Sequence, residues 1–154
     1  MCSMKPFSHL FYRIPFSETD AMGIVHHGNP PLYLERGRIE LLRLIGHDYL
    51  KITEQGLHFP VVEMSLRYKR PLKFDDIIVV ETFITLLTKT RLNFDYRIYR
   101  TSELALPVMA AEKFTGEELV LGQSQHCCTN DQGRPVAIAK ELFDKLSEIF
   151  KEQK

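Results

Sequence analysis

The clearest pattern in the chain is the alternation of apolar and polar residues across 91–100. Apolar side chains occupy every second position there: Leu92, Phe94, Tyr96 and Ile98. Because successive side chains of a strand point to opposite faces, this period of two predicts a β-strand with one buried face. Further strand-like runs occupy 11–16, 61–70, 77–87 and 119–129. Turn-forming segments at 71–76 and 88–90 favour antiparallel connections between consecutive strands.

The segment that begins at Asn29 has helical spacing instead. Asn29 suits the N-cap, Pro30 suits the first helical position, and Gly46 can end the helix. Its apolar residues form a broad stripe: Leu32, Leu34, Ile39, Leu41, Leu42 and Ile45. Gly37 in the middle costs about 1 kcal/mol relative to alanine, so we expect a sheet to press against the helix there. A second helix is predicted over 140–152.

One long buried helix followed by a meander of strands predicts an α+β fold in which the sheet curls around the helix. The chain of 154 residues is the size of one domain, and we expect residues 1–154 to form it, with a flexible N-terminus over 1–10. Pro107 and Gly116 interrupt the segment 101–118, whose structure the sequence leaves open.

Composition narrows the class of protein. Twenty acidic and twenty basic residues cancel, which removes the basic field of a dedicated nucleic-acid binder. Cys2 and the adjacent pair Cys127 and Cys128 cannot build a disulfide framework, which fits a reducing compartment. The chain shows no apolar signal-peptide core and no run of about 18 apolar residues, so we expect a cytoplasmic protein without a membrane span.

The candidate chemistry lies in the run 18–43. Asp20 precedes Gly23 by three residues, and the polar cluster 26–29 follows where the long helix begins. This order brings an acid close to a row of backbone amides, whose N–H groups and helix dipole favour negative charge. The competing interpretation makes Asp20 an ordinary turn residue that bonds its own backbone. A metal site is not predicted, because the adjacent His26 and His27 diverge and no third ligand stands at a recognisable spacing.

These residues resemble a known family, the hotdog-fold acyl-CoA thioesterases related to 4-hydroxybenzoyl-CoA thioesterase and to the thioesterase associated with the Tol-Pal system. The matching motif reads Asp20, Gly23, Ile24, Val25, His26, His27, Asn29, Glu35, Arg38 and Glu40. The segments 66–82 and 122–135 are similar to the family's tyrosine-arginine-proline and double-aspartate element and to its closing strand. The resemblance spans about residues 11–140 and rests on several linked motifs.

The resemblance implies a hotdog fold and a thioester hydrolase without a cofactor. Asp20 would act as general base or nucleophile, and the amide at His27 would polarise the thioester carbonyl. The expected supporting positions around them are Gly23, Val25, Gly28 and Asn29. Three departures stand out: His26 replaces the family's usual aromatic residue, Pro30 and Pro31 replace the residues that normally follow the asparagine, and the enlarged segment 101–118 has no recognised counterpart. The resemblance also implies a homodimer or homotetramer with active sites between subunits.

Coenzyme A carries phosphates, so its binding calls for local positive charge. The densest basic cluster, and the weak candidate for this role, consists of Arg67, Lys69, Arg70 and Lys73. An ordinary solvated face explains these residues equally well. Glu35, Arg38 and Glu40 are interpreted as structural ion-pairing residues of the helix, and Cys127 and Cys128 as packing residues.

Two other function classes compete with hydrolysis. One is a non-catalytic acyl-CoA or acyl-carrier binding module of the same fold, in which Asp20 only shapes a turn. The other is a hotdog dehydratase, which would need an Asp-His pair on the helix. No such pair stands between Leu32 and Leu44.

Overall fold

The computed structural model describes residues 8–110 and 112–153. Its main feature is a six-stranded antiparallel sheet in the order β2-β6-β4-β3-β1-β5. The strands are β1 (Ser8–Arg13), β2 (Val61–Tyr68), β3 (Ile77–Leu87), β4 (Arg91–Thr101), β5 (Val108–Met109) and β6 (Glu117–Cys127). The helices are α1 (Pro30–Leu44), α2 (Tyr49–Glu54) and α3 (Lys140–Glu152), with a short 3-10 turn at Phe16–Glu18.

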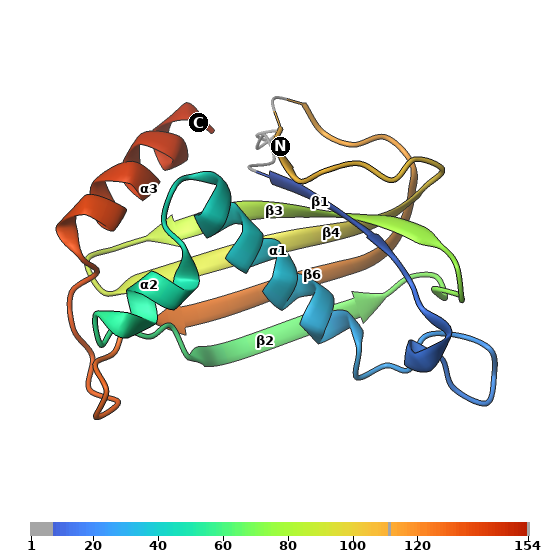
Figure 1. The fold of residues 1–154 in the computed structure, drawn as a ribbon, viewed down its shortest axis with the longest axis horizontal. Coiled ribbons are helices and arrows are strands. Elements are labelled where there is room, and N and C mark those ends of the chain that lie inside the picture. Colours follow the sequence, from blue (N-terminus) through green and yellow to red (C-terminus); the bar gives the residue numbers. More distant parts are fainter. Residues whose placement is uncertain (1–7, 111, 154) are drawn as a thin grey trace.

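Helix α1 crosses the inner face of the sheet, which wraps around it (Figure 1). Its buried side chains, among them Tyr33, Leu34 and Leu41, pack against inward-facing residues of β3, β4 and β6. A Cβ added at Gly37 would lie 2.7 Å from Thr82 Oγ1 and 3.1 Å from Val80 Cγ1, so the helix contacts β3 where the glycine stands. The α+β hotdog arrangement and the close approach at Gly37 are thus confirmed.

The long helix, the closing helix and the four long strands fall where the sequence pattern predicted them. Helix α2 was not predicted. It spans 6 residues, buries only Ile52, and begins at Asp48, whose carboxylate accepts a hydrogen bond from Leu50 N at 2.9 Å. A helix of this length shows too few turns for a periodic signal.

The prediction of a flexible N-terminus over 1–10 is wrong for Ser8, His9 and Leu10. These residues belong to β1 and pair with β3, and Ser8 and His9 also pair with β5. His9 Nε2 lies 2.9 Å from Glu81 Oε1, and both side chains are buried. Residues 1–7, which include Cys2, lie outside the described part of the chain.

The segment 101–118 folds back along β1 after leaving β4. Part of it forms β5. Further on, Phe114 packs edge-on against His9 with a centroid distance of 6.0 Å, and its ring is tilted by 45° against Tyr99 at 5.6 Å. It therefore covers the side of β3 and β4 that faces away from α1.

Cys128 lies in the hydrophobic core, and burial raises the pKa of its thiol to about 11. A thiol with this pKa is almost entirely protonated at neutral pH and is a poor nucleophile. The interpretation of Cys128 as a packing residue is confirmed. Among the described residues, none of the helices is long and apolar enough to span a lipid bilayer.

Candidate active site

The loop between the 3-10 turn and α1 places the Asp20 carboxylate. Asp20 N donates to Ile24 O at 2.8 Å, Gly23 N donates to Asp20 O at 3.0 Å, and Gly23 adopts a φ of 75° that glycine tolerates without strain. The side chain takes part as well, because Asp20 Oδ1 accepts from Met22 N at 2.8 Å. No hydrogen bond within the described residues engages Oδ2. Asp20 therefore shapes a turn with one oxygen and keeps the other available.

The backbone amides that follow are mostly occupied. His26 N donates to Glu18 O at 2.9 Å, and Asn29 N donates to His26 O at 2.9 Å. Gly28 N donates to His26 Nδ1 at 3.1 Å, so the His26 side chain blocks that amide. Pro30 and Pro31 have no N–H at all.

His27 is different from its neighbours. Its N–H makes no hydrogen bond to any residue that the structure describes, and the side chain is exposed. Between positions 26 and 31, this amide is therefore the donor left open toward solvent.

Glu18 holds the loop against the helix. Its carboxylate accepts hydrogen bonds from Tyr12 (2.6 Å) and from Tyr33, and its carbonyl oxygen accepts one from Asn29 Nδ2 at 2.8 Å. Burial, reinforced by the bond to Glu18, raises the pKa of Tyr33 above its ordinary value. Asn29 occupies the N-cap position of α1 as predicted, but its side chain makes no capping bond because it reaches back to Glu18.

A cavity of about 300 Å³ opens beside this loop. Its lining includes Asp20, His27, Tyr68, Lys69 and Arg70. Val25 also lines it, whereas Gly23, Gly28 and Asn29 shape the loop from outside the lining. Asp20 and His27 thus line the same cavity.

The four predicted basic residues do not gather at this cavity. Lys69 and Arg70 line it and form ion pairs with Glu118 (2.6 Å) and Glu117 (3.5 Å). Arg67 instead lines a separate hollow together with Asp95 and Gln123. Lys73 forms a β-bridge with Ile24 and does not line the cavity of Asp20.

Comparison with known proteins decides the family. Residues 22–105, more than half of the chain, match the model of the thioesterase superfamily. The chain belongs to the thioesterase superfamily. It is 32% identical over 136 residues to a putative esterase of Aquifex aeolicus, covering 88% of this chain and 94% of that protein.

Two further relatives support this membership. A putative acyl-CoA thioesterase of Bacillus subtilis is 29% identical over 132 residues, which cover 85% of this chain and 86% of that protein. A hypothetical protein of Thermus thermophilus has a crystal structure that superposes with a TM-score of 0.80 at 30% identity, covering 92% of this chain and 98% of that one. As a member of this superfamily, the protein is an enzyme of the thioester hydrolase class.

Sequence reasoning missed several residues that hold the loop of this thioesterase. Tyr68 is one of them: its hydroxyl donates to His27 O at 2.6 Å from the end of β2, 41 residues away. Glu18, Tyr12 and Tyr33 are the others. Its place in the tyrosine-arginine-proline element was the sequence feature that could have marked Tyr68 as important. The sequence could not show that the Tyr68 hydroxyl bonds the His27 carbonyl oxygen.

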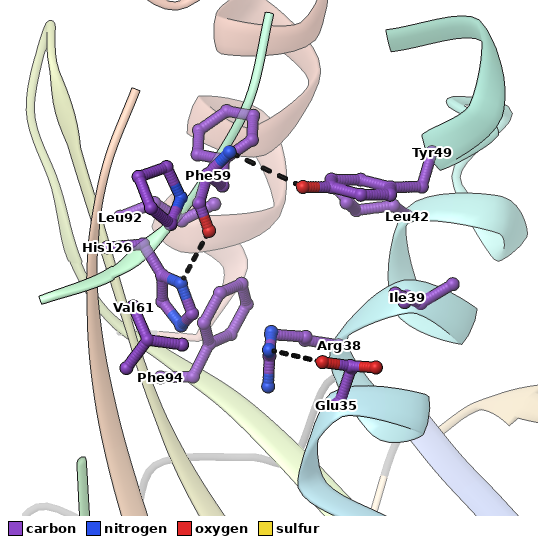
Figure 2. A pocket seen from close by; sticks show the side chains of 11 residues that line it. Glu35, Arg38, Ile39, Leu42, Tyr49, Phe59, Val61, Leu92, Phe94 and His126 are labelled. Atoms are coloured by element: carbon purple, nitrogen blue, oxygen red, sulfur yellow. Dashed lines mark hydrogen bonds and ion pairs between the residues drawn. The ribbon is translucent and has the colours of Figure 1, made fainter. Parts of the chain in front are cut away.

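The thioesterase has a second cavity, of about 280 Å³, between α1 and the first residues of β2 (Figure 2). His126 lies in its wall, where Nε2 is 2.7 Å from Ser124 Oγ and Nδ1 is 3.0 Å from Phe59 O. Ser124 Oγ is in turn 2.7 Å from the hydroxyl of Tyr96. A buried polar chain therefore connects β4, β6 and the loop before β2.

Burial of His126 predicts a pH-dependent stability. Burial lowers the pKa of His126 to about 4, against 6.5 in an unfolded chain. Between these values the unfolded chain binds a proton that the folded protein does not. The free energy of unfolding should therefore fall as pH drops from about 6.5 to about 4, by roughly 2–3 kcal/mol. Urea unfolding of the protein and of His126→Gln at several pH values measures this, and an equal pH dependence in both would contradict it.

Within the described residues, no three side chains of His, Cys, Asp or Glu gather in a way that could hold a metal ion. The expectation that His26 and His27 diverge is wrong, because their ring centroids lie 4.2 Å apart with the rings tilted by 34°. His26 Nδ1 accepts a hydrogen bond from Gly28 N.

Proposed function

We propose that the protein hydrolyses an acyl-CoA thioester, releasing the free acid and coenzyme A. The observation that carries the proposal is the shared cavity, whose lining includes both Asp20 and His27, the residue with the open N–H. Thioester hydrolysis needs a group that activates water or attacks the carbonyl, and a donor for the oxyanion that forms. The similarity to the putative acyl-CoA thioesterase of Bacillus subtilis supports the choice of substrate class.

In this mechanism Asp20 acts as general base or as nucleophile. As a base, it takes a proton from water while the water oxygen attacks the thioester carbon. The carbonyl oxygen becomes an oxyanion that the N–H of His27 stabilises. The intermediate then collapses, the carbon–sulfur bond breaks, and the thiolate of coenzyme A leaves and is protonated. As a nucleophile, Asp20 forms a mixed anhydride that water hydrolyses.

Lys69 and Arg70 are the proposed contacts for the phosphates of coenzyme A. Both line the cavity of Asp20, and their ion pairs with Glu118 and Glu117 lie near the surface, where phosphate oxygens can compete for the cations. Arg67 and Lys73 do not line the cavity of Asp20, and they are not proposed as contacts for the phosphates.

We also propose that the protein is an oligomer with its active sites near the subunit interface. Strand β2 is an edge strand of the sheet, and Val61 and Val62 expose 45% and 65% of their surface there. Unpaired edges with exposed apolar residues favour association with another chain. The free thiols of Cys127 and Cys128 support a reducing, cytoplasmic setting.

The experiment that tests the function is a thiol-release assay with the purified protein and a panel of aliphatic and aromatic acyl-CoAs. Release of free coenzyme A from at least one of them is expected. Tight binding of acyl-CoA without release from any would replace the proposal with a non-catalytic binding module.

Tyr68 is expected to act as a positioning residue. Replacing Tyr68 by Phe removes the hydrogen bond that fixes the His27 carbonyl, so the neighbouring N–H is held less firmly. We expect kcat to fall about tenfold while KM changes less than about twofold. The reason is that a less firmly held His27 N–H weakens stabilisation of the transition state more than binding of the substrate. Tyr49→Phe, in the other cavity, is the matched control. A similar loss of kcat in both variants, or in neither, would exclude this role.

A further inference from the structure

The peptide group that joins His27 to Gly28 is held at both ends by side chains. Its carbonyl oxygen, His27 O, accepts a hydrogen bond from the Tyr68 hydroxyl at 2.6 Å. Its N–H, on Gly28, donates to Nδ1 of the His26 ring at 3.1 Å. The preceding peptide group carries the open N–H of His27, and its carbonyl oxygen, His26 O, accepts from Asn29 N at 2.9 Å. Because the two groups meet at the Cα of His27, the direction of the open N–H depends on both of them.

The bond from Gly28 N needs a lone pair on Nδ1 of His26. A neutral imidazole offers this lone pair when its proton is on Nε2, whereas an imidazolium ion carries a proton on both nitrogens and accepts nothing. Imidazole is also the side chain whose charge ordinarily changes between about pH 5 and pH 8. One of the two bonds that hold the 27–28 peptide group therefore exists only while the ring of His26 is neutral.

The ring of His27 is the titratable group packed against His26. The two ring centroids lie 4.2 Å apart and the rings are tilted by 34°, so protonation of both rings would bring two positive charges into contact. Glu18 meets His26 through its backbone carbonyl oxygen, while its carboxylate accepts hydrogen bonds from Tyr12 and Tyr33. The other ionisable groups beside this loop line the cavity to which His27 belongs: Asp20, Tyr68, Lys69 and Arg70.

We propose that His26 is a positioning residue of the active site, whose neutral ring holds the Gly28 N–H and thereby fixes the direction of the N–H of His27. Protonation of His26 breaks this bond and leaves Tyr68 as the side chain that holds the 27–28 peptide group. The donor for the oxyanion is then held less firmly, so kcat falls toward acid pH while KM changes little. The effect on turnover rests on the proposed function, whereas the hydrogen bond can be measured in the free protein.

Two substitutions separate the acceptor atom from the ring. His26→Asn puts an amide oxygen near the place of Nδ1, so it can accept from Gly28 N at every pH of the experiment. His26→Phe keeps an aromatic ring beside His27 but has no acceptor. Thiol release from an acyl-CoA at about pH 8 should show kcat about tenfold lower in His26→Phe, with KM changed less than about twofold, and His26→Asn should restore kcat.

The pH profile adds a readout that a merely structural role would not move. The ratio of kcat in the parent to kcat in His26→Asn should decrease as pH is lowered from about 8 to about 5.5, toward the ratio found for His26→Phe. Taking the ratio removes the titration of Asp20, which both proteins share. His47→Asn is the matched control, because His47 follows α1 and lies outside the lining of the Asp20 cavity. Its pH profile should be that of the parent.

Amide NMR of the full chain without substrate tests the hydrogen bond independently of turnover. In the parent, the Gly28 amide proton should move upfield together with the titration of the His26 ring, because it loses its acceptor. In His26→Asn it should stay in place over the same pH range.

The outcomes separate a failure of the proposed function from a failure of this inference. If no acyl-CoA is hydrolysed at any pH, the proposed function fails and the positioning role falls with it, even where the Gly28 amide follows the His26 ring. If hydrolysis occurs, three results each overturn the positioning role: a kcat in His26→Phe equal to that of the parent, a parent-to-Asn ratio that is constant with pH, or a Gly28 amide that ignores the titration of His26.

Discussion

Replacing Asp20 by Asn is expected to lower kcat for acyl-CoA hydrolysis about a thousandfold, because the amide can neither accept the proton from water nor attack the carbonyl. The fold should survive the change. The asparagine oxygen can still accept the hydrogen bond from Met22 N that Asp20 Oδ1 accepts at 2.8 Å. Thiol release measures the rate, and thermal unfolding together with light scattering checks that fold and oligomer are intact.

Asp75→Asn is the matched control for this variant. Asp75 is an exposed turn residue with a φ of 67°, a conformation that asparagine adopts readily, and it pairs with Arg13 on the surface. Its replacement should leave kcat within about twofold of the parent value, as expected for a surface change. Full activity of Asp20→Asn would remove Asp20 from the mechanism, and the turn that it shapes would be its whole role.

Replacing Gly37 by Ala is expected to destabilise the protein by about 2 kcal/mol. On an isolated helix the same change stabilises by about 1 kcal/mol, because alanine is the better helix former. Here the new methyl group would lie 2.7 Å from Thr82 Oγ1 and 3.1 Å from Val80 Cγ1, so helix and sheet must move apart. The midpoint of urea unfolding measures the change.

The second variant in this test is Thr82→Ala. Thr82 Oγ1 is buried and has no hydrogen-bond partner among the described residues, so its removal should cost little and should relieve the closest contact. In the Thr82→Ala background the cost of Gly37→Ala should fall by about half, the rest coming from Val80. An identical cost in both backgrounds would show that the contact with Thr82 does not explain the glycine.

The sequence predicted the core of the fold because the periodic elements are long. Alternation over 91–100 and the stripe of α1 extend over many residues, so the pattern identifies strand and helix without tertiary information. The beginning of β1 escaped prediction for the opposite reason. Ser8 and His9 are polar, yet both are buried where β1 pairs with β3 and β5, and there β3 supplies Glu81 as a partner for His9.

The sequence could indicate the neighbourhood of Asp20 and the following amides as a candidate site, since these residues lie in one continuous run. The sequence could not predict which backbone amide remains without a hydrogen-bond partner. That depends on the Glu18 carbonyl oxygen, which accepts from His26 N, and on His26 Nδ1, which accepts from Gly28 N. The structure divides the predicted basic cluster for a similar reason. Strand β2 ends at Tyr68, and just past it Lys69 N and Arg70 N both donate to Leu119 O. The alternation of side chains along the strand is broken there, so Lys69 and Arg70 are separated from Arg67.

The central claim is that the thioester carbonyl is held by the N–H of His27 beside Asp20. Amide NMR of the Asp20→Asn variant saturated with an acyl-CoA tests this directly, because the bound thioester survives long enough to be observed. We expect the His27 amide proton to move downfield, as it does on hydrogen bonding, and to move further than those of Gly28 and Asn29, which already have partners. An unshifted His27 resonance at saturation would contradict the account.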